Sequence, residues 1–228
     1  FQEYSRGKPL NKLIQKGTYP SPHGTRVTFL PDDQIFGKDL KFLPIKIYET
    51  CRNKAFLFKG VKINWECDKS LLSRKENIPS KETLFYPEGL EQYLKSELSN
   101  AKKVHDKICS LKGDFQDKKG KVELVIQWHD NKNNFTKSFA NTVPTSNGGT
   151  HESGFRGGVA KAIRKYAKLK NNKTVIKASQ EDIFSHASYI VSVFIGNPEF
   201  EGQTKNKLSS SFVLKYCDQS VSILFEDW

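Results

Sequence analysis

A short polar loop near the end of the chain carries the side chains best suited to holding a phosphate. Gln203 and Lys205 stand two positions apart in the segment that begins at Gly202. A lysine ammonium acts as a point charge on a terminal phosphate, and a neighbouring amide can donate a hydrogen bond to the same group. Such contacts gain strength where water is excluded. The pattern is also typical of an ordinary exposed loop that bears one lysine.

The segment 141–156 is the second candidate for chemistry, because it places paired glycines beside a histidine. The glycines permit a sharp turn, and either Thr150 or Ser153 can cap a helix that begins near Phe155. His151 can act as a general base, but a packed or capping histidine is the commoner case. The segment therefore predicts a strand–turn–helix junction.

The helix that follows is expected to carry a basic stripe. Apolar residues fall on one helical face, at Phe155, Val159, Ala162, Ile163 and Tyr166. Cations fall on the opposite face, at Lys161, Arg164, Lys165 and Lys168. A stripe of this kind can neutralise nucleic-acid phosphates, and the solvated face of a surface helix has the same pattern.

The overall charge leaves the same two interpretations open. A net charge of +12 and a pI near 9.4 favour a polyanionic partner, while a lysine coat that keeps a small protein soluble gives a similar charge. The sequence shows no apolar run near the ~18 residues that span a bilayer and no basic-then-apolar secretory leader. We therefore expect a cytoplasmic protein with no membrane partner.

The cysteines are scattered along the chain without the close pairs that a zinc site or redox motif needs. They are Cys51, Cys67, Cys109 and Cys217. Reduced thiols and no metal site are the expectation.

The elements that position these residues follow from hydrophobic periodicity. Residues 25–29 alternate as a strand, and Pro44 begins a helix that Gly60 ends. Further elements are expected as strands over 61–65, 83–86, 122–128 and 189–195, a short helix over 89–98, and a C-terminal helix. Residues 135–143 are predicted to pair antiparallel with the strand 122–128 through a hairpin at 131–134. A loop over 196–204 precedes the last helix.

A domain boundary is expected within residues 99–120, where Lys, Asp, Gly and Ser replace the apolar pattern. Strands and helices mix on both sides without the regular alternation of a parallel doubly wound sheet. The predicted fold class is therefore α+β.

Four motifs, taken in order, resemble the B subunits of bacterial type IIA DNA topoisomerases over essentially the whole chain. They are QEYSRGKP at 2–9, GTRVTF at 24–29 with Pro31-Asp32 and Ile35-Phe36, the segment 141–156, and NPEFEGQTK at 197–205. The B subunit of topoisomerase IV is favoured over that of DNA gyrase. The details that favour it lie at 60–65, 141–144 and 181–183.

The resemblance implies two modules. Residues 1–98 would be the C-terminal part of a GHKL-type ATPase lobe. Residues 99–228 would be a transducer domain with a ribosomal protein S5 domain 2-like fold.

The resemblance also implies an ATP site. Thr25 and Val27 would lie against the adenine pocket, which receives aminocoumarin-type inhibitors in relatives. Gln203 and Lys205 match the transducer loop that contacts the γ-phosphate, and Lys205 would offset charge on the transferring phosphoryl group.

For DNA, the resemblance implies a further contact. Arg156 matches a position that lines the cavity through which a transported DNA duplex passes. The stripe would extend that positive wall at Lys161, Arg164, Lys165 and Lys168.

The family's catalytic glutamate and magnesium ligand precede the segment that matches Phe1, and its cleavage domain follows Trp228. The lack of methionine and the start at Phe1 suggest a fragment, which alone is expected neither to hydrolyse ATP nor to cleave DNA. The intact enzyme would use ATP and Mg²⁺, act on duplex DNA, pair with an A subunit and form a homodimer of B subunits. The alternatives are a DNA gyrase B fragment and a non-enzymatic, basic nucleic-acid-binding module.

Overall fold

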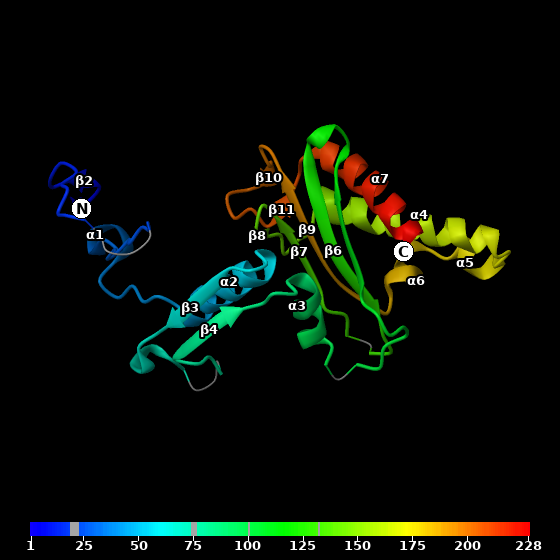
Figure 1. Ribbon diagram of the computed structural model, residues 1–228, viewed down its shortest axis with the longest axis horizontal. Coiled ribbons are helices and arrows are strands. Elements are labelled where there is room, and N and C mark those ends of the chain that lie inside the picture. The colour runs from blue at the N-terminus through cyan, green and yellow to red at the C-terminus, as the bar shows by residue number, and fades with distance from the viewer. Residues whose placement is uncertain (19–22, 74–76, 100, 132) are drawn as a thin grey trace. The chain divides into compact units, whose positions relative to one another are not determined.

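The computed structural model describes residues 1–18, 23–73, 77–99, 101–131 and 133–228. These residues form two compact units, 1–43 and 44–228. Figure 1 follows both from the blue N-terminal end to the red C-terminal helix. Within the described ranges, no helix combines the length and apolar character that crossing a membrane requires.

The first unit holds little regular structure. Its elements are the antiparallel pair β1 (Tyr4–Ser5) and β2 (Lys8–Pro9) and the helix α1 (Asp33–Phe36). The strand predicted at 25–29 is wrong: these residues have no regular structure, and the Val27 and Phe29 side chains are 78% and 72% exposed. A strand needs a hydrogen-bonded neighbour, and none of the described residues pairs with this segment.

The second unit opens with a helix, a hairpin and a second helix. These are α2 (Pro44–Leu57), β3 (Lys62–Glu66), the 3-10 helix η1 (Lys69–Leu71), β4 (Lys81–Phe85) and α3 (Leu90–Glu97). Pro44 suits the first helical position, where no backbone donor is needed. Ala55, Trp65 and Leu84 form a small core between α2 and the hairpin. The order predicted for 44–98 is confirmed.

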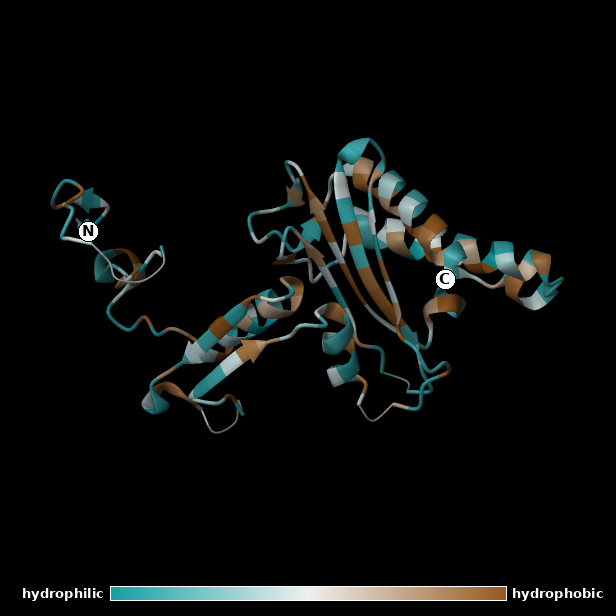
Figure 2. Cartoon of the chain, in the orientation of Figure 1, coloured by the Kyte–Doolittle hydropathy of each residue, from teal (hydrophilic) through white to brown (hydrophobic). Residues whose placement is uncertain are grey.

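A five-stranded sheet follows, in the order β5-β6-β9-β7-β8. Its strands are β5 (Cys109–Asp114), β6 (Gly120–Trp128), β7 (Thr136–Ala140), β8 (Val143–Pro144) and β9 (Ala187–Ile195). β6 pairs antiparallel with both β5 and β9, whereas β7 pairs parallel with β9. The strands predicted at 122–128 and 189–195 are confirmed, and Figure 2 shows hydropathy alternating along β6.

The predicted hairpin between 122–128 and 135–143 is wrong, because β9 lies between β6 and β7. Every residue of β9 except Phe194 is buried, so this strand takes the centre of the sheet. Alternation within 135–143 predicts a strand but not its neighbour. β5 and the 3-10 helix η2 (Gln116–Lys118) lie within the polar segment 99–120, where the sequence pattern predicts neither element.

Helices cover both faces of the sheet (Figure 1). One face packs on α4 (Thr150–Leu169), α6 (Gln180–Phe184) and α7 (Ser211–Asp227), and α5 (Lys173–Lys177) lies between α4 and α6 in the chain. The other packs on α2 and α3. Gly158 lets α4 approach α7 closely, since a Cβ there would lie 2.7 Å from the Asp218 carbonyl oxygen. The helix expected near Phe155 and the C-terminal helix are confirmed.

The division between compact units falls between Leu43 and Pro44. Residues of α2 and α3 share a core with β6, β7 and β9, formed by Phe56, Leu57, Leu90, Tyr93, Leu94, Leu98, Ile108, Val125, Phe139 and Ile190. The division into modules 1–98 and 99–228 rests on the family resemblance and not on compactness, and it stays a prediction.

Candidate functional site

The loop that carries Gln203 and Lys205 is the tip of a small hairpin. Its strands are β10 (Phe200–Glu201) and β11 (Lys207–Leu208), which pair antiparallel. Both candidate side chains are exposed, and the Lys205 ammonium lies 5.8 Å from the centre of the Phe200 ring. Lys205 has a left-handed backbone, with φ +56°. The hairpin thus carries an exposed amide and an exposed ammonium at its end.

The base of this hairpin is anchored firmly. Leu208 is fully buried. The Ser209 amide donates to the Glu199 carbonyl oxygen at 2.9 Å, and the Glu199 amide donates to the buried Ser210 hydroxyl at 2.9 Å. The tip can therefore reach a ligand while the base holds its direction.

The glycine turn of the second sequence cluster packs directly against this base. The Asn147 amide donates to the Asn206 carbonyl oxygen at 2.9 Å, and the Leu208 amide donates to the Gly148 carbonyl oxygen at 3.1 Å. A Cβ on Gly149 would lie 2.4 Å from the Leu208 carbonyl oxygen, and its φ is +139°. Only glycine fits so close an approach. The structure thus joins two motifs that lie some fifty positions apart in the sequence.

His151 is packed rather than poised for catalysis, as expected. It is fully buried, its Nε2 lies 3.1 Å from the Thr145 hydroxyl, and burial lowers its pKa to about 4. The predicted capping by Thr150 or Ser153 is wrong. Gly149 is the N-cap of α4, no side chain caps the helix, and α4 begins at Thr150.

Arg156 lies on α4 with its guanidinium 4.8 Å from the centre of the Phe184 ring. Its Nε is buried and has no hydrogen-bond partner among the described residues. The residue is therefore partly enclosed by α6.

The basic stripe on α4 is largely engaged within the chain. Lys161 pairs with Asp218 at 3.5 Å and Lys165 pairs with Glu226, both on α7. Arg164 donates twice to the Ala178 carbonyl oxygen, at 3.1 and 2.8 Å. Lys168 is exposed. Three of these cations thus have partners within the chain. The role of all four toward DNA stays a prediction.

Thr25 and Val27 belong to the first unit, whereas Gln203 and Lys205 belong to the second. The role of these four residues toward ATP stays a prediction. Thr25 is also exposed. Among the described residues, no group of three or more His, Cys, Asp or Glu side chains is arranged to hold a metal ion.

Comparison with known proteins relates this chain to the B subunits of bacterial DNA gyrase and DNA topoisomerase 4. The sequence profile described as DNA gyrase B matches residues 89–228. The chain is 39% identical to the B subunit of DNA topoisomerase 4 from Bartonella bacilliformis, over all of this chain and 33% of that protein. It is 32% identical to the B subunit of DNA gyrase from Helicobacter pylori, over 92% of this chain and 26% of that protein. The chain therefore spans about a third of such relatives.

Solved structures agree on the fold. The 43K ATPase domain of Thermus thermophilus gyrase B, in complex with an aminocoumarin, matches 99% of this chain and 59% of its own, with a TM-score of 0.78 and 28% identity. The ATP-binding domain of topoisomerase IV from Francisella tularensis, in complex with a small-molecule inhibitor, matches 86% of this chain and 50% of its own, with a TM-score of 0.65 and 26% identity.

Proposed function

Because this chain belongs to the DNA gyrase B family, we propose that it is part of the B subunit of a bacterial type IIA DNA topoisomerase. The parent enzyme would couple ATP binding and hydrolysis to the passage of one DNA duplex through another. Topoisomerase IV is the favoured parent, since identity reaches 39% with its B subunits and 32% with the gyrase relative. DNA gyrase is the alternative.

Within that subunit, residues 1–98 would be the C-terminal part of the ATPase lobe, and residues 99–228 would form the transducer. The ATP-binding domains among the solved relatives support placing the chain in the ATPase region of such a subunit. The transducer would carry the sensing hairpin, β10 to β11, back toward the nucleotide that the lobe binds.

The observation that carries the proposal is the form of this hairpin, an exposed amide and ammonium on an anchored base. Gln203 would donate to the γ-phosphate and Lys205 would balance its charge. Hydrolysis removes the group that both side chains hold, so the arrangement of the two modules that depends on it is released. Other switches held by a γ-phosphate work on the same physical basis.

The remaining contacts complete the proposal. Thr25 and Val27 would border the adenine, in a pocket that could also take an aminocoumarin, as the Thermus thermophilus domain does. The exposed Gln203 amide and Lys205 ammonium are donors that would suit the phosphate oxygens of ATP. Magnesium would need ligands that the described residues do not supply as a cluster.

Duplex DNA would contact the surface formed by α4. Arg156 would face the transported duplex, with Lys161, Arg164, Lys165 and Lys168 beside it. An A subunit would supply the DNA-cleaving tyrosine, and two B subunits would form the gate. The net charge of +12 supports a polyanionic partner.

The test is ATP turnover by the complete B subunit with its A subunit and DNA. Lys205→Ala should reduce kcat/KM for ATP about tenfold or more, the loss typical of removing a charge that stabilises the transferring phosphoryl group. Lys207→Ala is the matched control, because Lys207 lies in the same hairpin but pairs with Glu201 at the surface. Equal kcat/KM for the two variants would refute the γ-phosphate role.

A further inference from the structure

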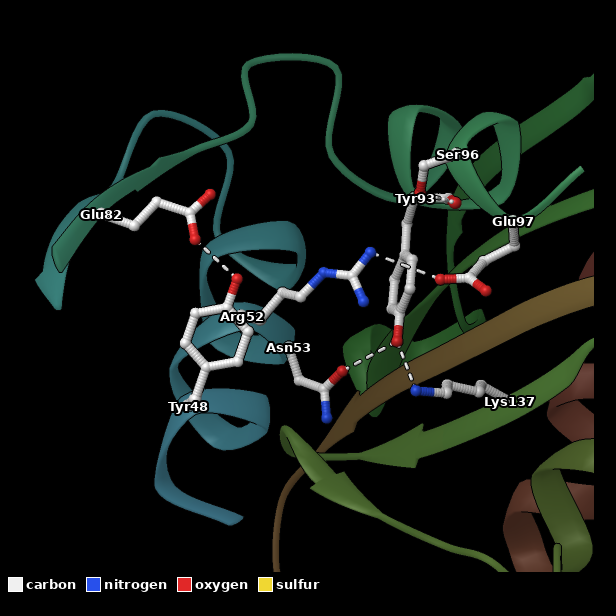
Figure 3. Close-up of polar contacts among 8 residues, drawn as sticks. All are labelled: Tyr48, Arg52, Asn53, Glu82, Tyr93, Ser96, Glu97 and Lys137. Carbon is white, nitrogen blue, oxygen red and sulfur yellow. Dashed lines mark hydrogen bonds and ion pairs between the residues drawn. The ribbon is translucent and has the colours of Figure 1, made fainter. Parts of the chain in front are cut away.

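A polar cluster centred on one buried tyrosine joins α2, α3 and β7, and no sequence motif indicates it. Its centre is the hydroxyl of Tyr93, a residue only 1% exposed. This hydroxyl donates to the Asn53 amide oxygen at 3.0 Å and accepts a hydrogen bond from the Lys137 ammonium. Figure 3 shows the two partners approaching it from α2 and from β7. One hydroxyl thus bridges a helix and a strand more than eighty positions apart in the sequence.

A charged pair lies beside the Tyr93 ring. Arg52 reaches Glu97 at 3.4 Å, and its guanidinium lies 5.4 Å from the centre of the Tyr93 ring (Figure 3). The Tyr93 ring in turn stacks on Phe56 at 4.1 Å. Burial lowers the pKa of Lys137, and the Glu97 carboxylate opposes that shift. Because the Tyr93 side chain is buried, a broken contact would leave its hydroxyl without that hydrogen-bond partner, and this favours one geometry.

A short chain of hydrogen bonds leads from Lys137 to the sensing hairpin. The carbonyl oxygen of the neighbouring Ser138 accepts from the Thr145 amide at 2.9 Å, and the Ser138 hydroxyl donates to the Thr145 carbonyl oxygen at 2.9 Å. Two residues later, the Asn147 amide donates to the Asn206 carbonyl oxygen. Asn206 directly follows Lys205.

A second contact ties α2 to the turn between β7 and β8. The Lys54 ammonium lies 3.3 Å from the Thr142 hydroxyl. Asn141 and Thr142 both have left-handed backbones, with φ of +48° and +69°. The Asn141 side chain holds this turn by bonding both the amide and the carbonyl oxygen of Ile195 at 2.8 Å. The β7–β8 connection is therefore fixed at both ends.

We propose that Tyr93 and Lys137 are positioning residues, which couple α2 to the hairpin that carries Gln203 and Lys205. The coupling itself is a property of the fold, and its use in sensing ATP rests on the function proposed above. A displacement of α2 would reach the hairpin through β7, Thr145 and the glycine turn. Neither residue would touch the nucleotide.

Hydrogen exchange on the full-length protein that contains this chain tests the coupling without reference to ATP. Tyr93→Phe removes the bridging hydroxyl and keeps the ring, and Lys137→Met removes the ammonium and keeps the stem. In both variants the Asn147 and Leu208 amides should exchange about fivefold faster, the loss expected for one hydrogen bond. Tyr48→Phe is the matched control. Tyr48 also lies on α2, but it donates to Glu82 on β4 at 2.6 Å and packs against the small core of Ala55, Trp65 and Leu84.

Two outcomes would overturn the inference. One is unchanged exchange at Asn147 and Leu208 in both Tyr93→Phe and Lys137→Met. The other is an equal acceleration of the amides of β5 and β6, because that would indicate only a loss of global stability.

A double-mutant cycle in the complete enzyme links the coupling to ATP. Tyr93→Phe should raise the ATP concentration at half-maximal turnover about fivefold and leave kcat within twofold. That effect should vanish in a Lys205→Ala background, and additive effects would contradict the coupling. If Lys205→Ala alone leaves ATP turnover unchanged, the proposed γ-phosphate role fails. The hydrogen-exchange rates at Asn147 and Leu208 then still test the coupling, because they do not depend on ATP.

Discussion

The backbone amide of Leu208 donates to the carbonyl oxygen of Gly148 at 3.1 Å. This bond fastens the base of the sensing hairpin to the turn that opens α4. The hairpin proposed to contact ATP through Gln203 and Lys205 is therefore bonded directly to the turn that precedes α4, the helix proposed to face DNA.

Gly149→Ala should destabilise the fold. A Cβ would meet the Leu208 backbone at 2.4 Å in a left-handed conformation, and the combined strain and overpacking should cost about 2 kcal/mol or more. Urea denaturation gives the free energy of unfolding. Gly196→Ala is the control, since a Cβ there meets no atom within 4 Å. Equal stability of the two variants would contradict the close approach.

Stability should fall as the pH drops from about 6.5 toward 4, in part because of His151. Burial lowers its pKa in the folded chain to about 4, below the ~6.5 of an unfolded histidine. The unfolded state therefore binds more protons in this window, so the free energy of unfolding rises with pH, by up to about 1.4 kcal/mol per unit. Denaturation of the wild type and of His151→Gln across pH 4 to 7 measures the difference. Parallel pH profiles would rule out this contribution.

Thiol reagents should separate the cysteines into two classes. Burial raises the pKa of Cys109 to about 12 and raises that of Cys217 as well, and both are fully buried. Cys51 and Cys67 are partly exposed. Iodoacetamide at neutral pH should label Cys67 in the native protein and should spare Cys109 and Cys217 until urea is added. Mass spectrometry of the peptides identifies the labelled sites, and early labelling of Cys217 would argue against the packing of α7.

Charge reversal at Arg156 should remove much of the stimulation of ATP turnover by DNA in the complete enzyme, because a positive contact to the duplex becomes a repulsive one. Basal turnover should change little. Lys215→Glu, a reversal at an exposed position of α7, is the matched control. Retention of full DNA stimulation in Arg156→Glu would remove the DNA contact from the proposal.

Periodicity predicted most of the helices and strands, and motif order predicted the family. α7 buries one stripe, so its apolar spacing is visible in the sequence. β6 is covered on both faces, but the alternation at Val122, Glu123 and Leu124 still marks it as a strand. The glycines at 148 and 149 signalled a sharp turn, and the hairpin with Gln203 and Lys205 was found by its residue types. The capping of α4 was predicted wrongly, because Gly149 gives the N-cap through its backbone alone.

The amino-acid sequence alone determined what each segment can do locally: its period, its turn chemistry and its charge. Only the tertiary structure decided which segments meet. It inserted β9 between β6 and β7, left residues 25–29 without a partner strand among the described residues, and brought Tyr93 to Lys137. Strand pairing and buried polar contacts depend on competition among groups far apart in the chain, so a local sequence pattern does not determine which of them pair.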